Sequence, residues 1–449
     1  MISNSLRRTS LLAILSLLFL CACGDGPVLL TAGTSTTGAG TGTSTGGTGT
    51  GTGNAGTGNS GGNTIASAGP NVVQVSVDGG PAGSPTGIFN IPYVSVTICA
   101  PGSTTNCQTI DHIEVDTGSS GLRVISSVVS SPVLAALPQE VTTDSQAPIA
   151  ECTQFADGVA WGSIRTADVV LSGETGPSQP IQIIGDPDFP SVPPACSNAG
   201  STVEATVATF GANGILGVGQ FVQDCGDGCT ASTETGAYWS CPGFGGQNCG
   251  PVAVPLNQQV ANPVASFKTD NNGVILEMHS VVAAGSVDAG ATTASGALVF
   301  GIATQTNNTL GTAKVYSTDG DGNVSINYKG VTYPTSSIDS GLNLNFIPDG
   351  SIATCAMGIN QVFCPASQLA LNALVQGQNG VEGTVNFNMA DAEALFKANP
   401  TDAAFDNVAA PDTLPGGFDF GMPFFYGRNV FIAIEGMPSP GGNGPYFAF

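Results

Sequence analysis

Basic residues are scarce in this chain. Its 449 residues include only 9 lysines and arginines against 32 aspartates and glutamates, which gives a formal net charge of −23 at pH 7. Proteins that bind nucleic acid neutralise backbone phosphates with clustered Lys and Arg side chains, and so few basic residues cannot form such a cluster. The composition therefore excludes nucleic acid as a partner.

Charge of either sign is also low, because charged residues make up 9% of the chain. Long surface helices stabilised by ion pairs are not expected, and the 63 glycines and 29 prolines favour turns. Short runs rich in β-branched residues, which are typical of strands, lie at 72–77, 93–98, 169–171, 298–300, 324–328 and 430–434. Helical periodicity is limited to 368–374 and 390–397. We predict an all-β fold.

The first 22 residues have the pattern of an exported lipoprotein. Arg7 and Arg8 precede an apolar run at 11–20, and Leu20-Cys21-Ala22-Cys23 follows. A charged region, a short apolar run and a small residue before a cysteine are typical of a bacterial lipoprotein signal. We predict a signal peptide at 1–22 and lipidation of Cys23. A non-lipidated signal or a membrane-spanning anchor is the alternative, but the apolar run has about ten residues where about 20 are needed to span a bilayer.

Residues 23–69 are expected to hold the lipidated cysteine and a flexible tether. Positions 31–64 are almost wholly Gly, Thr, Ser and Asn, and such a segment cannot bury enough apolar surface to offset its ordering entropy. The folded part is then expected to begin near residue 70. We expect contact with the membrane through the lipid anchor only, in the cell envelope, facing the periplasm or in the outer membrane if the organism is Gram-negative.

Ten of the 12 cysteines follow the predicted lipidation site Cys23, and an even number in an exported protein indicates disulfides. Cys99 with Cys107, and Cys355 with Cys364, are close enough in sequence to close single loops. Cys152 is a candidate partner of Cys196. The remaining four, which are expected to pair among themselves, are Cys225, Cys229, Cys241 and Cys249. A four-cysteine zinc site in this group is the alternative, but irregular spacing and an oxidising compartment disfavour it, so we predict no metal.

One motif occurs twice. Ile113-Glu114-Val115-Asp116-Thr117-Gly118-Ser119-Ser120 ends one predicted strand, and Ser337-Ile338-Asp339-Ser340-Gly341 ends another. In both, a strand delivers an aspartate into a tight turn, followed by a hydroxyl residue and a glycine that permits close backbone approach. Two carboxyl groups that meet at a pseudo-twofold axis need this arrangement. The paired turns resemble those of the pepsin-like aspartic peptidases.

The resemblance extends over residues 70–449. Asn213-Gly214-Ile215-Leu216-Gly217 and Phe418-Asp419-Phe420-Gly421 resemble the strands that pass through the two active-site loops of that family. Residues 154–158, running on to Gly162-Ser163, resemble the flap hairpin. Residues 295–301 resemble the strand that leads into the C-terminal lobe, and 446–449 resemble the closing strand. The motifs also resemble those of an uncharacterised bacterial lipoprotein family in which peptidase activity is inferred.

The implied fold is an all-β, bilobal, pepsin-like fold with a central cleft. The N-terminal lobe would span 70–290, with a Cys-rich insertion at 221–255, and the C-terminal lobe 291–449. The implied activity is that of a monomeric endopeptidase that acts on peptide or protein substrates without a cofactor. Asp116 and Asp339 would share one proton, so that one activates a water molecule and the other polarises the scissile carbonyl.

The resemblance also implies roles for the residues that follow each aspartate. The hydroxyls of Thr117 and Ser340 would form hydrogen bonds to the opposite loop, and Ser119 would orient Asp116. Gly118 and Gly341 would complete the two turns.

Three features depart from the family pattern. Phe155 stands where the flap normally has a tyrosine, with Trp161 nearby as a substitute donor or a packing residue. Leu342 stands where a hydroxyl residue usually orients the second aspartate. The insertion at 221–255 could narrow or block the cleft. These departures support an alternative, a catalytically inactive pepsin-like fold that serves as a binding or structural lipoprotein of the cell envelope. A third hypothesis, a disulfide-rich β adhesin, predicts no two-lobed cleft.

Two other features have competing interpretations. Arg123 could bind a substrate carboxylate, although a structural hydrogen-bond donor is favoured. Asp319-Gly320-Asp321-Gly322-Asn323 begins like a calcium loop, but Val324 and Gly330 occupy its sixth and twelfth positions. We predict a hairpin turn there.

Overall fold

The computed structural model describes residues 63–200, 202–243, 245–281, 290–357, 360–412 and 416–449. The predicted signal peptide, Cys23 and the tether as far as residue 62 lie outside these residues. No helix in the described part of the chain is long and apolar enough to cross a membrane. Strands dominate the described residues, which confirms the prediction of an all-β protein.

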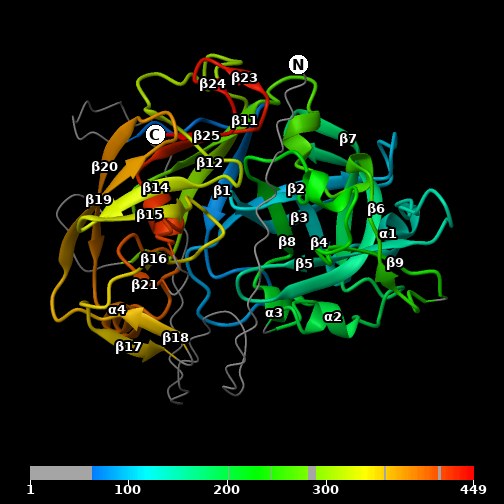
Figure 1. Ribbon diagram of the computed structural model, residues 1–449, viewed down its shortest axis with the longest axis horizontal. Helices are drawn as coiled ribbons and strands as arrows, with labels where there is room; N and C mark the ends of the chain where they lie inside the picture. The colour runs from blue at the N-terminus through cyan, green and yellow to red at the C-terminus, as the bar shows by residue number, and fades with distance from the viewer. Residues whose placement is uncertain (1–62, 201, 244, 282–289, 358–359, 413–415) are drawn as a thin grey trace, which may run out of the picture.

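One sheet of 15 strands runs through both halves of the molecule (Figure 1). In spatial order its strands are β10 (Gly250–Pro251), β9 (Tyr238–Ser240), β5 (Ile149–Gln154), β6 (Val159–Leu171), β7 (Glu174–Ile184), β4 (Ser120–Ile125), β8 (Gly214–Val218), β3 (Cys107–Asp116), β2 (Pro92–Cys99), β1 (Val72–Val77), β12 (Ala294–Phe300), β11 (Gly273–Met278), β22 (Asn429–Ala433), β25 (Tyr446–Ala448) and β13 (Val315–Ser317). Strands β2 to β9 gather in one lobe, which is cyan and green in Figure 1.

The other lobe, yellow to orange in Figure 1, contains smaller sheets. Four strands pair in the order β15 (Val331–Ser336), β14 (Val324–Tyr328), β19 (Leu369–Gln376) and β20 (Glu382–Met389). Three two-stranded pairs are β16 (Asn345–Ile347) with β21 (Ala409–Pro411), β17 (Thr354–Met357) with β18 (Asn360–Phe363), and β23 (Pro438–Ser439) with β24 (Gly442–Asn443).

Helices in the described part of the chain are short. The α-helices are α1 (Ser131–Ala136), α2 (Pro194–Ser197), α3 (Val207–Phe210), α4 (Ala392–Ala398) and α5 (Met422–Phe425). The 3-10 helices are η1 (Ser126–Val128), η2 (Gly226–Cys229), η3 (Leu256–Gln258) and η4 (Pro263–Ser266).

Of the strands that join the two lobes, β11 and β22 are buried along almost their whole length and β12 from Gly296 onward, whereas β1 exposes Gln74 and Ser76. β1 pairs with β12, and β11 pairs with both β12 and β22, so strands from the segments 70–290 and 291–449 alternate at the centre of the sheet. Leu276 and Leu298 lie in the main core, whereas Ile275 and Val299 pack in a separate cluster. Where both faces are covered, as at 297–300 of β12 and 430–433 of β22, the strand is a continuous apolar run rather than an alternating one.

One helix prediction is wrong and one is confirmed. Residues 368–374 were expected to be helical, but they lie mainly in β19, which pairs along its length with β20 and also with β14. Leucine and alanine favour helix locally, but cross-strand pairing overrides that preference. The second predicted helix corresponds to α4, where the Asp391 side chain accepts a hydrogen bond from the Ala394 N–H at 2.9 Å and so caps the N-terminus.

Five disulfides join the ten cysteines of the folded part. The pairs are Cys99–Cys107, Cys152–Cys196, Cys225–Cys229, Cys241–Cys249 and Cys355–Cys364. The prediction of a disulfide-bonded protein is confirmed. The four cysteines of the insertion pair with near neighbours, so their sulfurs are bonded to each other and do not form a four-cysteine zinc site.

Candidate active site

The first aspartate ends strand β3. Ile113 and Val115 anchor this strand in the main core, and β3 runs parallel to β8, with Asp116 opposite Gly217. A Cβ atom at Gly217 would lie 2.6 Å from the backbone nitrogen of Ser120. A glycine is therefore required where the strand passes behind the aspartate turn.

The second aspartate occupies an equivalent position in the other lobe. Ile338 forms a parallel bridge with Phe420, and the Asp339 N–H donates to the Phe420 carbonyl at 2.8 Å. A Cβ at Gly421 would collide with the Leu344 carbonyl oxygen. The segment 418–421 therefore lies beside the second turn as the strand around 213–217 lies beside the first.

The two turns interlock through Thr117 and Ser340. The Thr117 N–H donates to Ser340 Oγ at 3.2 Å, and the Ser340 N–H donates to Thr117 Oγ1 at 2.9 Å. The Thr117 hydroxyl then donates to the Ile338 carbonyl, and the Ser340 hydroxyl to the Val115 carbonyl, at 3.3 and 2.7 Å. This reciprocal exchange makes the two loops symmetric and fixes their separation.

The carboxyl groups of Asp116 and Asp339 meet between the interlocked turns. They are close enough to hydrogen-bond with each other. Burial is the main cause that raises the pKa of Asp339 well above its usual range, and the nearby Asp116 adds to the shift. A Cβ at Gly341 would lie 2.8 Å from Asp116 Oδ1, and one at Gly118 would collide with the Asp339 carboxyl. Each aspartate thus lies over the glycine of the opposite turn. This contact is incompatible with the adhesin hypothesis.

Hydrogen-bond donors are distributed unequally over the two aspartates. Asp116 accepts from the Gly118 N–H at 2.7 Å and from the Ser119 hydroxyl. Asp339 accepts from the Gly341 N–H at 2.8 Å, and Leu342 offers no hydroxyl at the position that corresponds to Ser119. The pair is therefore symmetric in backbone but asymmetric in its side-chain donors.

A third carboxyl lies next to the pair. Glu114, two residues before Asp116, is 8% exposed, and burial raises the pKa of its carboxyl well above the usual range, with Asp116 adding to the effect. Apolar residues flank it in β3, so the sequence around it resembles an ordinary buried strand. Its burial beside the pair was not anticipated.

The predicted flap is a hairpin of β5 and β6. The Phe155 N–H donates to the Gly158 carbonyl at 2.8 Å and closes the turn. The Phe155 ring packs edge to face on Phe210 at 5.7 Å between ring centroids. Trp161 is buried beside Trp239, and its indole N–H donates to the Phe189 carbonyl at 3.1 Å. Trp161 is thus a packing residue, and its donor is not directed at the aspartates.

A cavity of about 390 Å³ lies beside the first turn. Gly118 and Ser119 line one side, Phe155 lines another, and Phe221 and Thr235 contribute a wall. The insertion therefore lines part of this cavity. Within the insertion, β9 pairs with β5 and widens the flap sheet.

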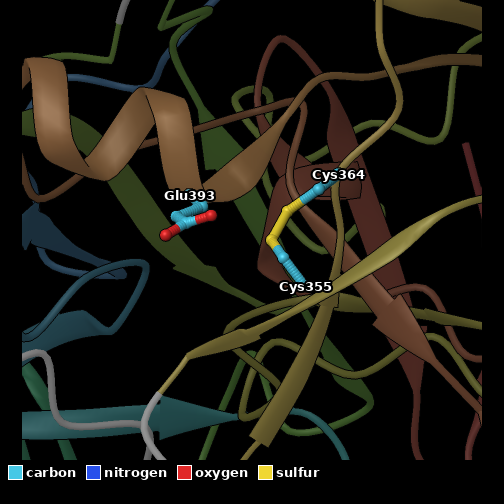
Figure 2. A group of neighbouring side chains, drawn as sticks. All are labelled: Cys355, Cys364 and Glu393. Atoms are coloured by element: carbon cyan, nitrogen blue, oxygen red, sulfur yellow. A yellow bond between two sulfur atoms is a disulfide. The ribbon is translucent and has the colours of Figure 1, made fainter.

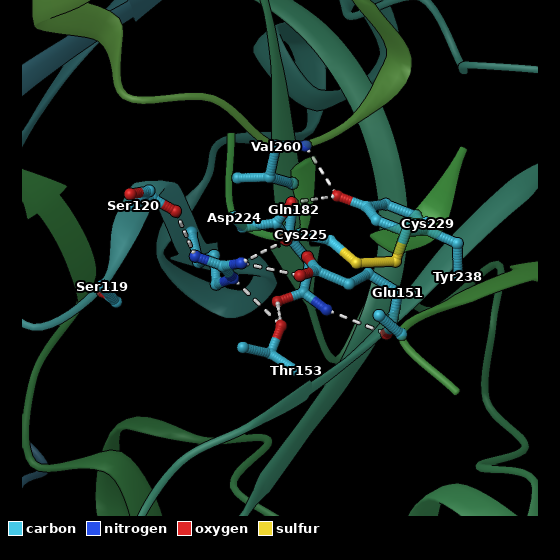
Figure 3. A network of polar contacts seen from close by, with 12 residues as sticks. Ser119, Ser120, Glu151, Thr153, Gln182, Asp224, Cys225, Cys229, Tyr238 and Val260 are labelled. Carbon is cyan, nitrogen blue, oxygen red and sulfur yellow. Dashed lines mark hydrogen bonds and ion pairs between the residues drawn. A yellow bond between two sulfur atoms is a disulfide. The ribbon is translucent and has the colours of Figure 1, made fainter. Parts of the chain in front are cut away.

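Arg123 also lines this cavity, but its guanidinium is held by the protein. Nη2 contacts Glu151 Oε1 at 2.6 Å and Asp224 Oδ2 at 2.9 Å (Figure 3). The structural interpretation of Arg123 therefore agrees with its contacts. Sequence reasoning missed Glu151 and Asp224, because they lie 73 positions apart on the flap strand and the insertion and no local motif connects them.

One other group of ligand-type side chains stands apart from this site. Cys355, Cys364 and Glu393 offer atoms within 4.8 Å of one another, and Glu393 projects from α4 beside the disulfide (Figure 2). Because the two sulfurs are bonded to each other, they are not available as thiolate ligands.

The segment 319–323 forms a turn between β13 and β14, but β13 pairs with β25 and β14 with β15 and β19, so the prediction of a hairpin is wrong. Asp319 Oδ1 accepts hydrogen bonds from the backbone N–H groups of Asp321 and Asn323, at 2.9 and 2.8 Å. A carboxylate that closes its own loop in this way is typical of an Asx turn. These bonds give the aspartate a structural role in the loop.

Comparison with known proteins places the chain in a family. Residues 67–449 match a family model described as "Protein of unknown function (DUF3443)". The chain belongs to this family. A search of curated protein sequences found no match. The DUF3443 chain is also similar to a solved structure described as "Crystal structure of aspartic proteinase from Irpex lacteus", with a TM-score of 0.46 and 15% identity over 84% of this chain and 96% of that chain.

The fold of this DUF3443 member is defined by its own geometry. Two lobes share a central sheet, each lobe supplies one aspartate turn, the turns interlock, and a hairpin borders the cavity beside them. The prediction of an all-β, bilobal, pepsin-like fold is confirmed.

Proposed function

We propose that this protein is an aspartic-type endopeptidase in which Asp116 and Asp339 activate water for peptide-bond hydrolysis. The contact between the two carboxyl groups is the observation that carries the proposal. Because burial and Asp116 raise the pKa of Asp339, the pair holds one proton between its two members at mildly acidic pH. One group is then a base and the other an acid, which general acid–base hydrolysis requires.

The distribution of donors supports a role for each aspartate. The Ser119 hydroxyl and the Gly118 N–H stabilise negative charge on Asp116, so Asp116 acts as the base that removes a proton from water. Asp339 retains the shared proton and polarises the scissile carbonyl. The water attacks directly, so the reaction needs neither a covalent intermediate nor a cofactor.

The surroundings of the pair suit an extended peptide. The cavity lies beside Ser119 and is bordered by Phe155 of the flap, so a chain bound there would pass next to the aspartates. Peptide or protein substrates are therefore proposed, with the protein acting as a monomer.

The test is digestion of casein and a peptide library by the purified protein at pH 3 to 6, with and without pepstatin. We expect pepstatin-sensitive cleavage that falls about 10³-fold in Asp116→Asn and in Asp339→Asn. Asp321→Asn, which removes an exposed carboxylate from a distant turn, serves as the control and should cleave normally. Absence of cleavage by the unsubstituted protein at every pH, or unchanged cleavage in Asp116→Asn, would reject the proposal.

A second candidate function is a catalytically inactive fold that binds partners in the cell envelope. Leu342 supports it, because Asp339 has no hydroxyl corresponding to Ser119, and Phe155 supports it, because the flap has no phenol. Hydrogen bonds around a reacting pair hold it to the tolerance that chemistry requires. Pepstatin-sensitive turnover would exclude this candidate.

We also propose that Cys23 is lipidated and holds the protein in the cell envelope. The signal pattern at 1–22 and the Gly/Thr-rich segment that follows support this location. Mass spectrometry of the mature N-terminus should show an acylated Cys23. Cys23→Ser should move the protein from the membrane fraction to the soluble fraction, and an unmodified N-terminus would reject the proposal.

A further inference from the structure

A second carboxyl pair lines the cavity beside the first aspartate turn. Glu151 comes from strand β5 and Asp224 from the insertion, and both contact Nη2 of Arg123 (Figure 3). The side chain of Glu151 is 1% exposed and that of Asp224 is 10% exposed. Asp224 therefore presents the more accessible of the two carboxyl groups.

Arg123 does not make this cavity positive. Its Nε donates to Thr153 Oγ1 at 3.0 Å, and Nη1 donates to the Ser120 carbonyl at 2.9 Å. Nη2 contacts the two carboxyl groups, so all three nitrogens of the guanidinium have partners within the protein. One guanidinium thus faces two carboxyl groups, and the cavity favours cations over anions.

The cluster lacks one hydrogen-bond donor. Asp224 Oδ1 accepts a hydrogen bond from the Tyr238 hydroxyl at 2.7 Å. Arg123 Nη2 donates hydrogen bonds to Asp224 Oδ2 and to Glu151 Oε1. Glu151 Oε2 is buried and has no hydrogen-bond partner. A buried, unpartnered carboxylate oxygen is destabilising by several kcal/mol unless a proton or a cation joins it.

A proton can meet this need. Burial is the main cause that raises the pKa of Asp224 well above its usual range, and the negative charge of Glu151 is the second. The positive charge of Arg123 opposes the shift. Tyr238, which donates to Asp224, is the other titratable group in contact. The Asp224 carboxyl therefore favours its protonated form, and a bound cation could take the place of that proton.

A disulfide next to each residue fixes the positions of Glu151 and Asp224. Glu151 precedes Cys152, which is bonded to Cys196, and Asp224 precedes Cys225, which is bonded to Cys229. Both carboxyl groups are thus attached to backbone that is crosslinked before any ligand arrives. A rigid arrangement of this kind reduces the entropy lost on binding.

We propose that this cavity is a subsite for a cationic side chain, a lysine ammonium or an arginine guanidinium, of a peptide bound across the two aspartates. The inference rests on the proposed peptide-binding function of the cleft and adds the class of substrate. Asp224 and Glu151 are the specificity-determining residues, and the ligand cation supplies the donor that the cluster lacks. Ser119 and Phe155 line the same cavity, so the recognised residue lies close to the bond that would be cleaved.

The test uses binding and so does not depend on turnover. Fluorescein-labelled octapeptides of alanine, leucine and phenylalanine carry a single lysine or, at the same position, a norleucine, and the position is moved along the peptide. Affinities are measured by fluorescence anisotropy on the full chain with the Asp116→Asn substitution, which prevents cleavage. At one position we expect the lysine peptide to bind about tenfold more tightly than its norleucine partner.

Asp224→Asn in the same background should remove this lysine preference. Asp227→Asn is the matched control, because it removes the same charge three residues away from an exposed side chain, and it should retain the preference. Glu151→Gln provides a second variant if Asp224→Asn does not fold. Equal affinity for every lysine and norleucine pair, or the same preference in Asp224→Asn as in Asp227→Asn, would overturn the subsite and leave the cluster a purely structural one.

The two proposals fail in different ways. A lysine preference without cleavage by the unsubstituted protein would support the subsite and reject the endopeptidase. Cleavage without any lysine preference would support the endopeptidase and reject the subsite.

Discussion

Thr117 and Ser340 lie 223 positions apart and exchange hydrogen bonds, each backbone N–H donating to the side-chain oxygen of the other. Each hydroxyl then donates to a carbonyl of the opposite loop. The two halves of the chain are therefore joined at the point where their aspartates meet. The stability of this junction and the chemistry of the aspartates are therefore coupled.

The first prediction concerns Ser340→Ala. The substitution leaves the Thr117 N–H and the Val115 carbonyl buried without their partners, so we expect the free energy of unfolding to fall by about 1–3 kcal/mol. Chemical denaturation measures it. Ser95→Ala, at an exposed position of β2, should change stability by less than about 0.5 kcal/mol. Equal effects of the two substitutions would show that the reciprocal bonds contribute nothing.

The second prediction concerns the glycine below the second aspartate. A methyl group at Gly118 would collide with the Asp339 carboxyl, so Gly118→Ala should displace Asp339 and lower the cleavage rate about 100-fold. Gly79→Ala is the control, because nothing lies within 4 Å of the Cβ position there, and its rate should be unchanged. Full activity in Gly118→Ala would contradict the contact between the two turns.

The third prediction adds the missing donor. Leu342→Ser introduces a hydroxyl that can donate to Asp339 as Ser119 donates to Asp116, and a donor to the ionised form lowers the pKa of a carboxyl. Because Asp339 must stay protonated to polarise the carbonyl, the alkaline limb of the pH–rate profile should move to lower pH. Leu342→Ala removes the apolar side chain without adding a donor and should leave that limb in place. A shift of equal size in both variants would exclude the hydrogen bond as its cause.

The fourth prediction concerns a carboxyl next to the flap. Burial is the main cause that raises the pKa of Glu204 from its ordinary value of 4.5 to about 8, and the nearby Asp157 adds to the shift. Glu204 Oε1 has no hydrogen-bond partner. The folded state therefore binds a proton that the unfolded state has lost between these two pH values. Stability from this group is present below about pH 4.5 and is lost as the pH rises through about 8.

Glu204→Gln imitates the protonated carboxyl at every pH. We expect its Tm at pH 8 to exceed that of the unsubstituted protein by a few degrees, and the two to agree at pH 4. Glu234→Gln, at an exposed position, should shift Tm at neither pH. A Glu204→Gln variant that is less stable at pH 8 would reverse the sign and reject the buried, protonated state.

The order of the local motifs could be predicted from the sequence because each motif encodes its own geometry. An aspartate at the end of an apolar strand, with a hydroxyl residue and a glycine behind it, specifies the turn in which Asp116 and Asp339 are found. Cysteines separated by few residues can reach few partners, which made Cys99–Cys107 and Cys355–Cys364 predictable. Composition alone was sufficient for the all-β class.

Long-range packing decided the rest. Residues 368–374 carry helix-forming side chains, yet pairing with β14 and β20 makes most of them part of a strand. In the sequence, Arg123 is a lone basic residue near the first aspartate turn. Its two carboxylate partners, Glu151 and Asp224, are brought to its guanidinium only by the folding of the chain. Neither carboxylate is marked by its neighbours in the chain, since charge, burial and proximity in a cavity arise only when distant segments pack together.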